Sequence, residues 1–179
     1  MAISTRISRR RIVLLGLVLG LLASVAVAAP ALAATTTRFQ ASFVEQTSFV
    51  PCPPGPPPKA QCFSGHGDGE AIPPGGPATE SFQGFVDVAA ADPVTHCTPN
   101  YTAATIATGS GKLYLVAQGR NCPTGPTSAV DNGTWTAVGG TGIFADARGS
   151  GTFSTEATFN PDGTISSKTT YDGTLRLSN

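Results

Sequence analysis

Polar and apolar positions alternate strictly at the C-terminal end of the chain. From residue 164 to residue 177 the even positions are polar, while most odd positions are apolar or small. Residues 152–159 alternate in the same way. A period of two residues is typical of a β-strand with one buried and one solvated face. The pattern therefore predicts two neighbouring strands that share a dry face.

The four residues between these segments have the composition of a tight turn. They read Asn160-Pro161-Asp162-Gly163, in which the proline presets φ for a type I turn and the glycine can adopt the left-handed conformation. A loop of this kind fixes the register of a hairpin. It predicts that Phe153 lies opposite Tyr171 and that Phe159 lies opposite Ile165.

A second hairpin is predicted over residues 101–118. Its two strands, 101–108 and 111–118, flank Gly109-Ser110, and a glycine in the first position of a two-residue loop suits a type II′ turn. In that register Cys97 lies opposite Cys122. We expect a disulfide between them that closes the open end of the hairpin.

Further strands are expected at residues 38–50 and 79–89, and no segment after residue 34 has a helical period. The glycine-rich segment 66–70 is interpreted as a solvated loop, and Asn132-Gly133 as a turn or a bulge. We count seven or eight short strands, which predicts an all-β domain that closes into an antiparallel barrel or packs as a sandwich.

The N-terminus has the features of a cleaved signal peptide. Arginines precede an apolar core at 12–29, and Ala31-Leu32-Ala33 has small residues at the positions that signal peptidase reads. We expect a signal peptide at 1–33 and a mature domain at 34–179, with an uncleaved anchor as the alternative. Ser8-Arg9-Arg10 leaves the general secretory and twin-arginine routes both open.

Loss of the leader changes the charge of the chain. Eleven basic and eleven acidic residues balance in the whole sequence, but four arginines lie in the leader. The mature chain is therefore mildly acidic and has no basic stripe, which argues against a nucleic-acid partner. We expect a secreted, extracellular protein without a stable membrane anchor; the oligomeric state is left open.

All four cysteines lie in the exported part, where an even number indicates disulfides. With Cys97 paired to Cys122, the remaining pair is Cys52 and Cys62. It would close a proline-rich loop at residues 51–62 that is extended and exposed.

The segment Gly140 to Thr152 reads Gly-Thr-Gly-x-Phe-Ala-x-Ala-x-Gly-x-Gly-Thr. It resembles a segment of bacterial secreted proteins in the allene oxide cyclase-like and dirigent-like barrel superfamily, and the likeness covers about residues 134–177. The resemblance implies a single closed antiparallel barrel of eight strands, plugged by Phe144. Plant members of the superfamily cyclise an epoxy fatty acid or steer radical coupling of phenols.

No nucleophile elbow, phosphate loop or dinucleotide-binding fingerprint occurs in the chain. His66, Asp68 and Glu70 alternate, but their spacing matches no known metal motif, so we expect no metal and no cofactor. Glu45 shares its strand parity with Phe43 and would point into the barrel, where a carboxylate could act as a general base. A rim position is the alternative for Glu45.

The expected ligand pocket contains Phe43, Glu45, Phe153 and Tyr171, although Tyr171 could equally fill the core. Three functions remain open. The first is a barrel that binds a small apolar ligand. The second is an extracellular interaction protein that uses the proline-rich loop. The third is a cofactor-free isomerase or cyclase that uses Glu45.

Overall fold

The structure, a computed structural model, describes residues 35–178, and the predicted signal peptide lies outside them. The described part is all-β apart from two single-turn 3₁₀ helices, η1 (Val88–Ala90) and η2 (Gly142–Phe144). The strands are β1 (Thr35–Val50), β2 (Ala60–Ile72), β3 (Pro77–Asp87), β4 (Thr98–Thr108), β5 (Gly111–Gly125), β6 (Ser128–Gly140), β7 (Arg148–Phe159) and β8 (Thr164–Leu177).

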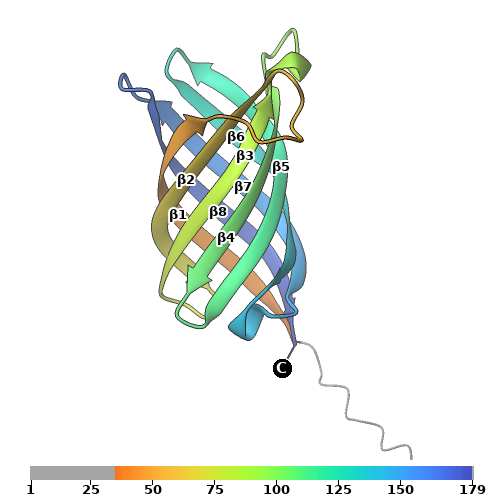
Figure 1. The fold of residues 1–179 in the computed structure, drawn as a ribbon. Helices are drawn as coiled ribbons and strands as arrows, with labels where there is room; N and C mark the ends of the chain where they lie inside the picture. The colour runs from red at the N-terminus through yellow and green to blue at the C-terminus, as the bar shows by residue number, and fades with distance from the viewer. Residues whose placement is uncertain (1–34, 179) are drawn as a thin grey trace, which may run out of the picture. The chain divides into compact units, whose positions relative to one another are not determined.

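The strands form one closed antiparallel barrel in chain order, in which β1 also pairs with β8 (Figure 1). The predicted fold class is thereby confirmed. Four connections lie at one end, which we call the mouth end: residues 51–59, 88–97, 126–127 and 160–163. The other three, residues 73–76, 109–110 and 141–147, lie at the opposite end, which we call the floor end.

The C-terminal hairpin has the predicted register. Phe153 pairs with Tyr171, and Phe159 pairs with Ile165. Gly163 has a φ of 86°, the left-handed conformation expected from the turn sequence. Local turn chemistry and side-chain alternation therefore suffice to align these two strands.

The hairpin of β4 and β5 also has its predicted register, because Ala104 pairs with Leu115 and Ile106 with Leu113. The predicted type II′ turn is wrong. That turn needs a positive φ at Gly109, whereas the positive φ in this hairpin belongs to Gly111. The predicted register is nevertheless correct, because it depends on the number of residues in the loop and not on the turn type.

Two glycine-containing segments lie within strands, contrary to the sequence interpretation. Residues 66–70 belong to β2, and Asn132-Gly133 lies in the middle of β6. The first is held in a strand by pairing on both sides. At Gly133 a Cβ atom would come within 2.7 Å of the Phe153 ring, so glycine is required there by packing and not by a turn.

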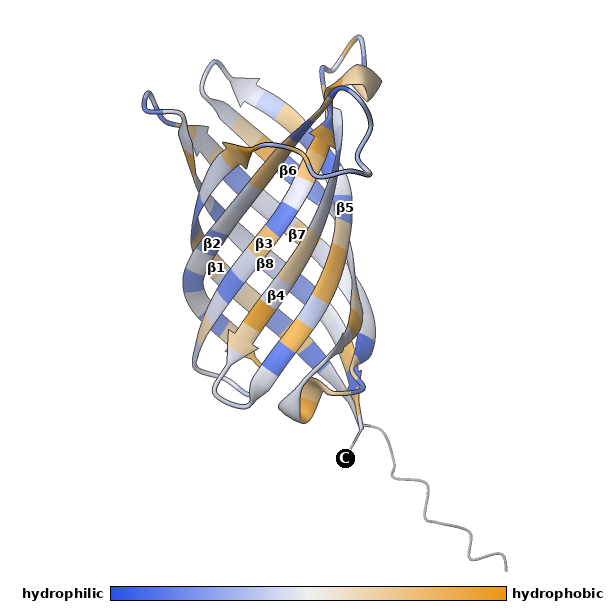
Figure 2. Ribbon diagram, viewed as in Figure 1, coloured by the Kyte–Doolittle hydropathy of each residue, from blue (hydrophilic) through white to orange (hydrophobic). Residues whose placement is uncertain are grey.

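Hydrophobic and hydrophilic residues alternate along the strands (Figure 2). The inward residues fill the floor half of the barrel. Trp135 is 1% exposed, lies edge-on to Phe39 with ring centroids 5.3 Å apart, and donates from Nε1 to the Thr152 carbonyl oxygen. The connection after β6 adds buried Phe144 and Ala147. The floor end is therefore packed.

Both expected disulfides are present, Cys52–Cys62 and Cys97–Cys122. The first closes the proline-rich connection between β1 and β2, and most of that loop is exposed. The second joins the start of β4 to the end of β5. Both bridges lie at the mouth end.

Candidate functional site

A cavity of about 220 Å³ occupies the mouth half of the barrel. Every strand contributes at least one lining residue, and these residues come from the mouth-end portion of each strand. Because the floor half is packed, the cavity opens at the mouth end only. A cavity of about 150 Å³ holds one benzene ring, so this one has room for a substituted ring or a molecule of similar size.

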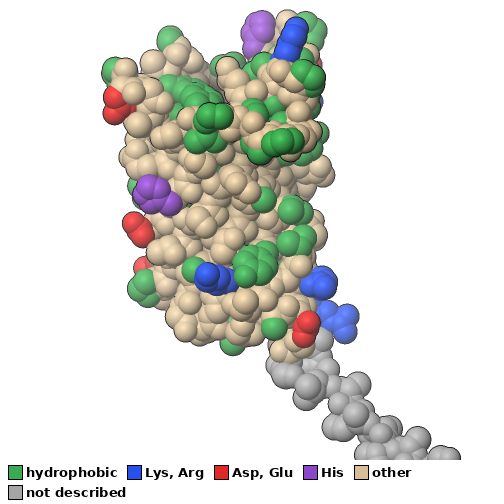
Figure 3. Space-filling model, in the orientation of Figure 1, with side chains coloured by type: hydrophobic (Ala, Val, Ile, Leu, Met, Phe, Trp, Pro, Cys, Tyr) green, Lys and Arg blue, Asp and Glu red, His purple; other side chains and the backbone are tan. Residues whose placement is uncertain are grey.

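The cavity walls are mainly apolar. Three apolar lining residues are at least one-third exposed and so form part of the rim: Phe49 is 50% exposed, Val88 38% and Phe159 36%. Hydrophobic side chains gather at this end of the molecule (Figure 3). The other apolar lining residues include Phe63, Phe82, Val86, Phe153 and Ile165. Such walls favour a ligand with an apolar body.

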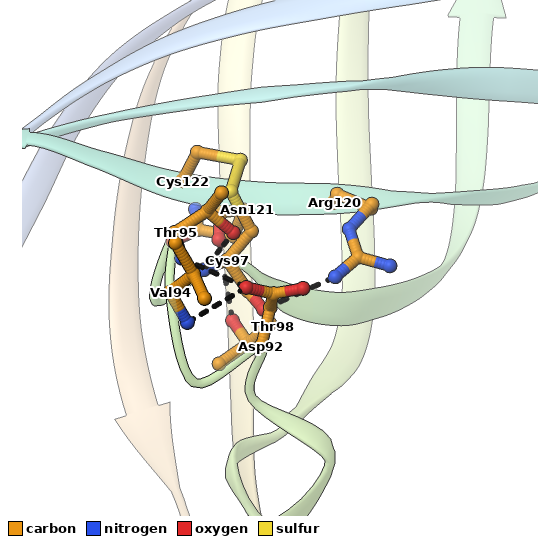
Figure 4. The surroundings of a disulfide bond; sticks show 8 residues. All are labelled: Asp92, Val94, Thr95, Cys97, Thr98, Arg120, Asn121 and Cys122. Atoms are coloured by element: carbon orange, nitrogen blue, oxygen red, sulfur yellow. Dashed lines mark hydrogen bonds between the residues drawn. A yellow bond between two sulfur atoms is a disulfide. The ribbon is translucent and has the colours of Figure 1, made fainter.

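The connection between β3 and β4 forms part of the rim and is well anchored (Figure 4). The Asp92 carboxylate accepts hydrogen bonds from the backbone N–H groups of Val94 and Thr95, which lower the pKa of Asp92. The disulfide of Cys97 with Cys122 ties the end of this connection to β5. The rim beside the cavity is therefore fixed by a turn and by a covalent bond.

A group of buried polar residues lies at the bottom of the cavity. The Ser167 hydroxyl donates to Glu45 Oε2 at 2.8 Å, and the Tyr171 hydroxyl donates to Glu80 Oε1 at 2.6 Å. Burial, followed by the nearby Glu45 carboxyl, raises the pKa of Glu80 well above its usual value. Burial also raises the pKa of Tyr171. Burial therefore disfavours the charged forms of both side chains.

A second polar pair lies on the wall of the cavity. Asn100 on β4 and Asp131 on β6 meet across β5, where Nδ2 of Asn100 donates to Oδ2 of Asp131. The strand between them has Gly119 at this point, and a Cβ atom there would lie 2.6 Å from Asp131 Oδ1. Burial raises the pKa of Asp131 to about 6. The missing side chain of Gly119 is what allows the pair to form.

The structure brings together three of the four residues expected in the ligand pocket. Glu45, Phe153 and Tyr171 line the cavity. Phe43 does not: it is 1% exposed and packs below the cavity, with its ring centroid 6.3 Å from that of Tyr171. The alternative rim position of Glu45 is excluded by its burial. The roles of these residues in binding or catalysis stay predictions.

Glu80, Asn100 and Asp131 are buried polar residues that were not predicted from the sequence. Strand parity could have found them. Glu80 shares the parity of Phe82 on β3, and Asp131 shares that of Trp135 on β6, so each has to face the interior of the barrel. An acidic residue in a strand of alternating polar and apolar positions usually faces solvent. The residue type alone therefore does not indicate that Glu80 or Asp131 is buried.

Within residues 35–178 no group of His, Cys, Asp or Glu side chains is arranged to hold a metal ion. His66, Asp68 and Glu70 are exposed on the outer face of β2. The four cysteines are all in disulfides, so the described part has no free thiol. Among these residues no helix is long and apolar enough to span a membrane.

No protein-family model matches the chain, and no curated protein sequence matches it. Among solved structures, the pterocarpan synthase dirigent protein GePTS1 is similar, with 16% identity and a TM-score of 0.42 over 82% of this chain and 90% of that one. The pterocarpan synthase dirigent protein PsPTS1 is similar at 16% identity and a TM-score of 0.41, over 81% and 97% of the two chains. We draw no conclusion about this chain from either likeness. Membership of the superfamily named above, and a bacterial source, stay predictions of the sequence.

The raised pKa of the buried Asp131 carboxyl predicts an unusual dependence of stability on pH. Asp131 titrates near 3.8 when unfolded and at about 6 when folded, so the folded state binds more protons between these values. The free energy of unfolding should therefore fall, by about 2 kcal/mol, as the pH rises from about 4 to about 7. Urea unfolding across this range measures it.

Asp131→Asn is expected to flatten that slope. The matched control is Asp172→Asn on the exposed face of β8, because the pKa of Asp172 is lowered, by the hydrogen bond from Arg38, and so shifts stability only at lower pH. A wild-type stability that rises through the same range would contradict the prediction.

Proposed function

We propose that this protein binds a compact, largely apolar small molecule in the barrel cavity. The observation that carries the proposal is the one-ended cavity, apolar along its walls and polar at its base. A barrel of eight strands can hold one small ligand or be filled by its own side chains. Here the floor half is filled and the mouth half is not.

The polar groups at the base and on the wall give the ligand a preferred orientation. An apolar body would contact the walls near Phe82 and Phe153, while a polar end would reach Ser167, Tyr171 or Asp131. Small-molecule sites commonly combine apolar walls with a few polar groups that fix orientation. The size of the cavity favours a single substituted ring, or the end of a longer chain that leaves through the mouth.

Secretion of the protein is part of this proposal. Two disulfides are typical of proteins that fold outside the reducing cytosol. A binding barrel in that setting would collect its ligand from the medium or the cell surface.

Filling the cavity tests the proposal. Ala157 lines the cavity on β7, and Ala157→Phe places a ring inside it. Titration with benzyl alcohol, followed by amide chemical shifts in NMR spectra, should show saturable shifts for the wild type at residues of the cavity. The variant should bind at least about tenfold more weakly, because the ring occupies the space of the ligand.

Thr158→Phe is the matched control, because Thr158 is exposed on the outer face of the same strand. It should bind benzyl alcohol like the wild type. Equal weakening by both variants, or the absence of shifts around the cavity in the wild type, would contradict a binding cavity for molecules of this size.

A further inference from the structure

Two acceptor atoms on the wall of the cavity have no partner. The Asn100–Asp131 hydrogen bond uses Nδ2 of Asn100 and Oδ2 of Asp131, which leaves Oδ1 of each residue without a hydrogen bond among residues 35–178. Asp131 is 5% exposed and Asn100 is 7% exposed, and both line the cavity. A buried acceptor without a donor is costly, so these atoms call for a donor from a ligand.

The charge of the cavity narrows the choice of donor. Its lining includes the carboxyl groups of Glu45 and Asp131, and Glu80 lies close by, bonded to the Tyr171 hydroxyl. Among the described residues, no Lys, Arg or His lines the cavity. A carboxylate in a poorly solvated space is stabilised by an opposite charge, and the protein supplies none here.

An aromatic ring lies beside the unpartnered acceptor of Asp131. A Cβ atom built on Gly119 would be 2.6 Å from Asp131 Oδ1 and 2.8 Å from Cζ of Phe153, so the carboxylate and the ring border the same point. Aromatic faces attract cations, and the attraction grows where water is excluded. The same place therefore offers an unpartnered acceptor, a carboxylate and an aromatic ring.

We infer that the ligand of this cavity is a small organic cation, whose ammonium group donates to Asp131 Oδ1 and Asn100 Oδ1 while its apolar body lies against Phe153 and the other aromatic walls. The inference rests on the proposed function and specifies the class of its ligand. A neutral alcohol would supply a donor but no countercharge, and a carboxylate ligand would be repelled by Glu45 and Asp131.

Three compounds of one shape and different charge test the inference: benzylamine, benzyl alcohol and benzoate, titrated by calorimetry near neutral pH. Benzylamine should bind about tenfold more tightly than benzyl alcohol, because hydrogen bonds between charged groups are stronger than neutral ones. Benzoate should bind more weakly than either. Benzyl alcohol binding as tightly as benzylamine would overturn the inference and leave the proposed function standing.

Asp131→Asn separates charge from shape in the same assay. The variant should lose about tenfold in affinity for benzylamine and change little toward benzyl alcohol. Glu156→Gln is the matched control, because Glu156 is an exposed carboxylate on the outer face of β7, and this variant should behave like the wild type. An equal loss for benzylamine and benzyl alcohol in Asp131→Asn would overturn the charge argument.

The failures of the two claims are distinguishable. Should none of the three compounds bind, both the ligand class and the binding cavity would be refuted for molecules of this size. Should benzyl alcohol bind in the wild type and not in Ala157→Phe, while benzylamine gains nothing over it, only the ligand class would be refuted.

Discussion

Replacing Trp135 with alanine is expected to lower the free energy of unfolding by about 3–5 kcal/mol, the usual cost of truncating a large buried aromatic side chain. Trp135 is 1% exposed, packs edge-on against Phe39, and donates a hydrogen bond to the Thr152 carbonyl oxygen. Its loss leaves a cavity in the packed half of the barrel and removes the hydrogen bond to the Thr152 carbonyl oxygen. Urea unfolding followed by far-ultraviolet circular dichroism measures the change without relying on tryptophan fluorescence.

The control for Trp135→Ala lies on the same strand. Val138 on β6 is 51% exposed, so Val138→Ala should change the free energy of unfolding by less than about 1 kcal/mol. Comparable losses in both variants would contradict the view that burial of Trp135 in the core accounts for its contribution to stability.

Removing the disulfide between Cys97 and Cys122 is the second large effect. The bridge closes a segment with a sequence separation of 25, so the double variant Cys97→Ala, Cys122→Ala should lose about 3 kcal/mol of stability. Stability falls because the unfolded chain gains conformational freedom when the bridge is removed. The rim connection, which Asp92 and Arg120 also help to hold, is released as well. Chemical unfolding under oxidising conditions measures it.

The other disulfide provides the comparison. Cys52–Cys62 closes a shorter segment, with a separation of 10, in an exposed loop. Cys52→Ala with Cys62→Ala should therefore cost less than the first pair, and it should leave the binding of benzyl alcohol unchanged. A larger loss of stability from removing Cys52–Cys62 would contradict the expectation that the disulfide closing the longer segment stabilises the protein more.

Local patterns were sufficient to predict six of the eight strands and two of the hairpin registers. The β7–β8 register follows from the turn at residues 160–163 and from the alternation on either side of it. The β4–β5 register, and with it the Cys97–Cys122 bridge, follows from the two residues between those strands. In each case the information lies within a few residues of the turn, where sequence patterns are read most directly.

The cavity could not be predicted in the same way, because it depends on what lies across the barrel. Residues 66–70 were interpreted as a loop, yet pairing with β1 and β3 makes them a strand. Phe43 was expected in the pocket, but it packs below the cavity. The meeting of Asn100 with Asp131 over Gly119 joins three strands at one point, and no local pattern indicates it.

The pairing of β1 with β8 has a consequence for how the barrel is made. Every other neighbouring pair of strands is joined by a short connection, whereas this seam aligns the two ends of the domain over 14 residue pairs. Contacts between residues so far apart in the chain carry a large loop-closure cost and form slowly. Until the last strand is available, β1 and β7 both have unpaired edges that invite association with other chains. Pairing of β8 with β1 is thus the step at which an aggregation-prone sheet with two open edges becomes a closed barrel.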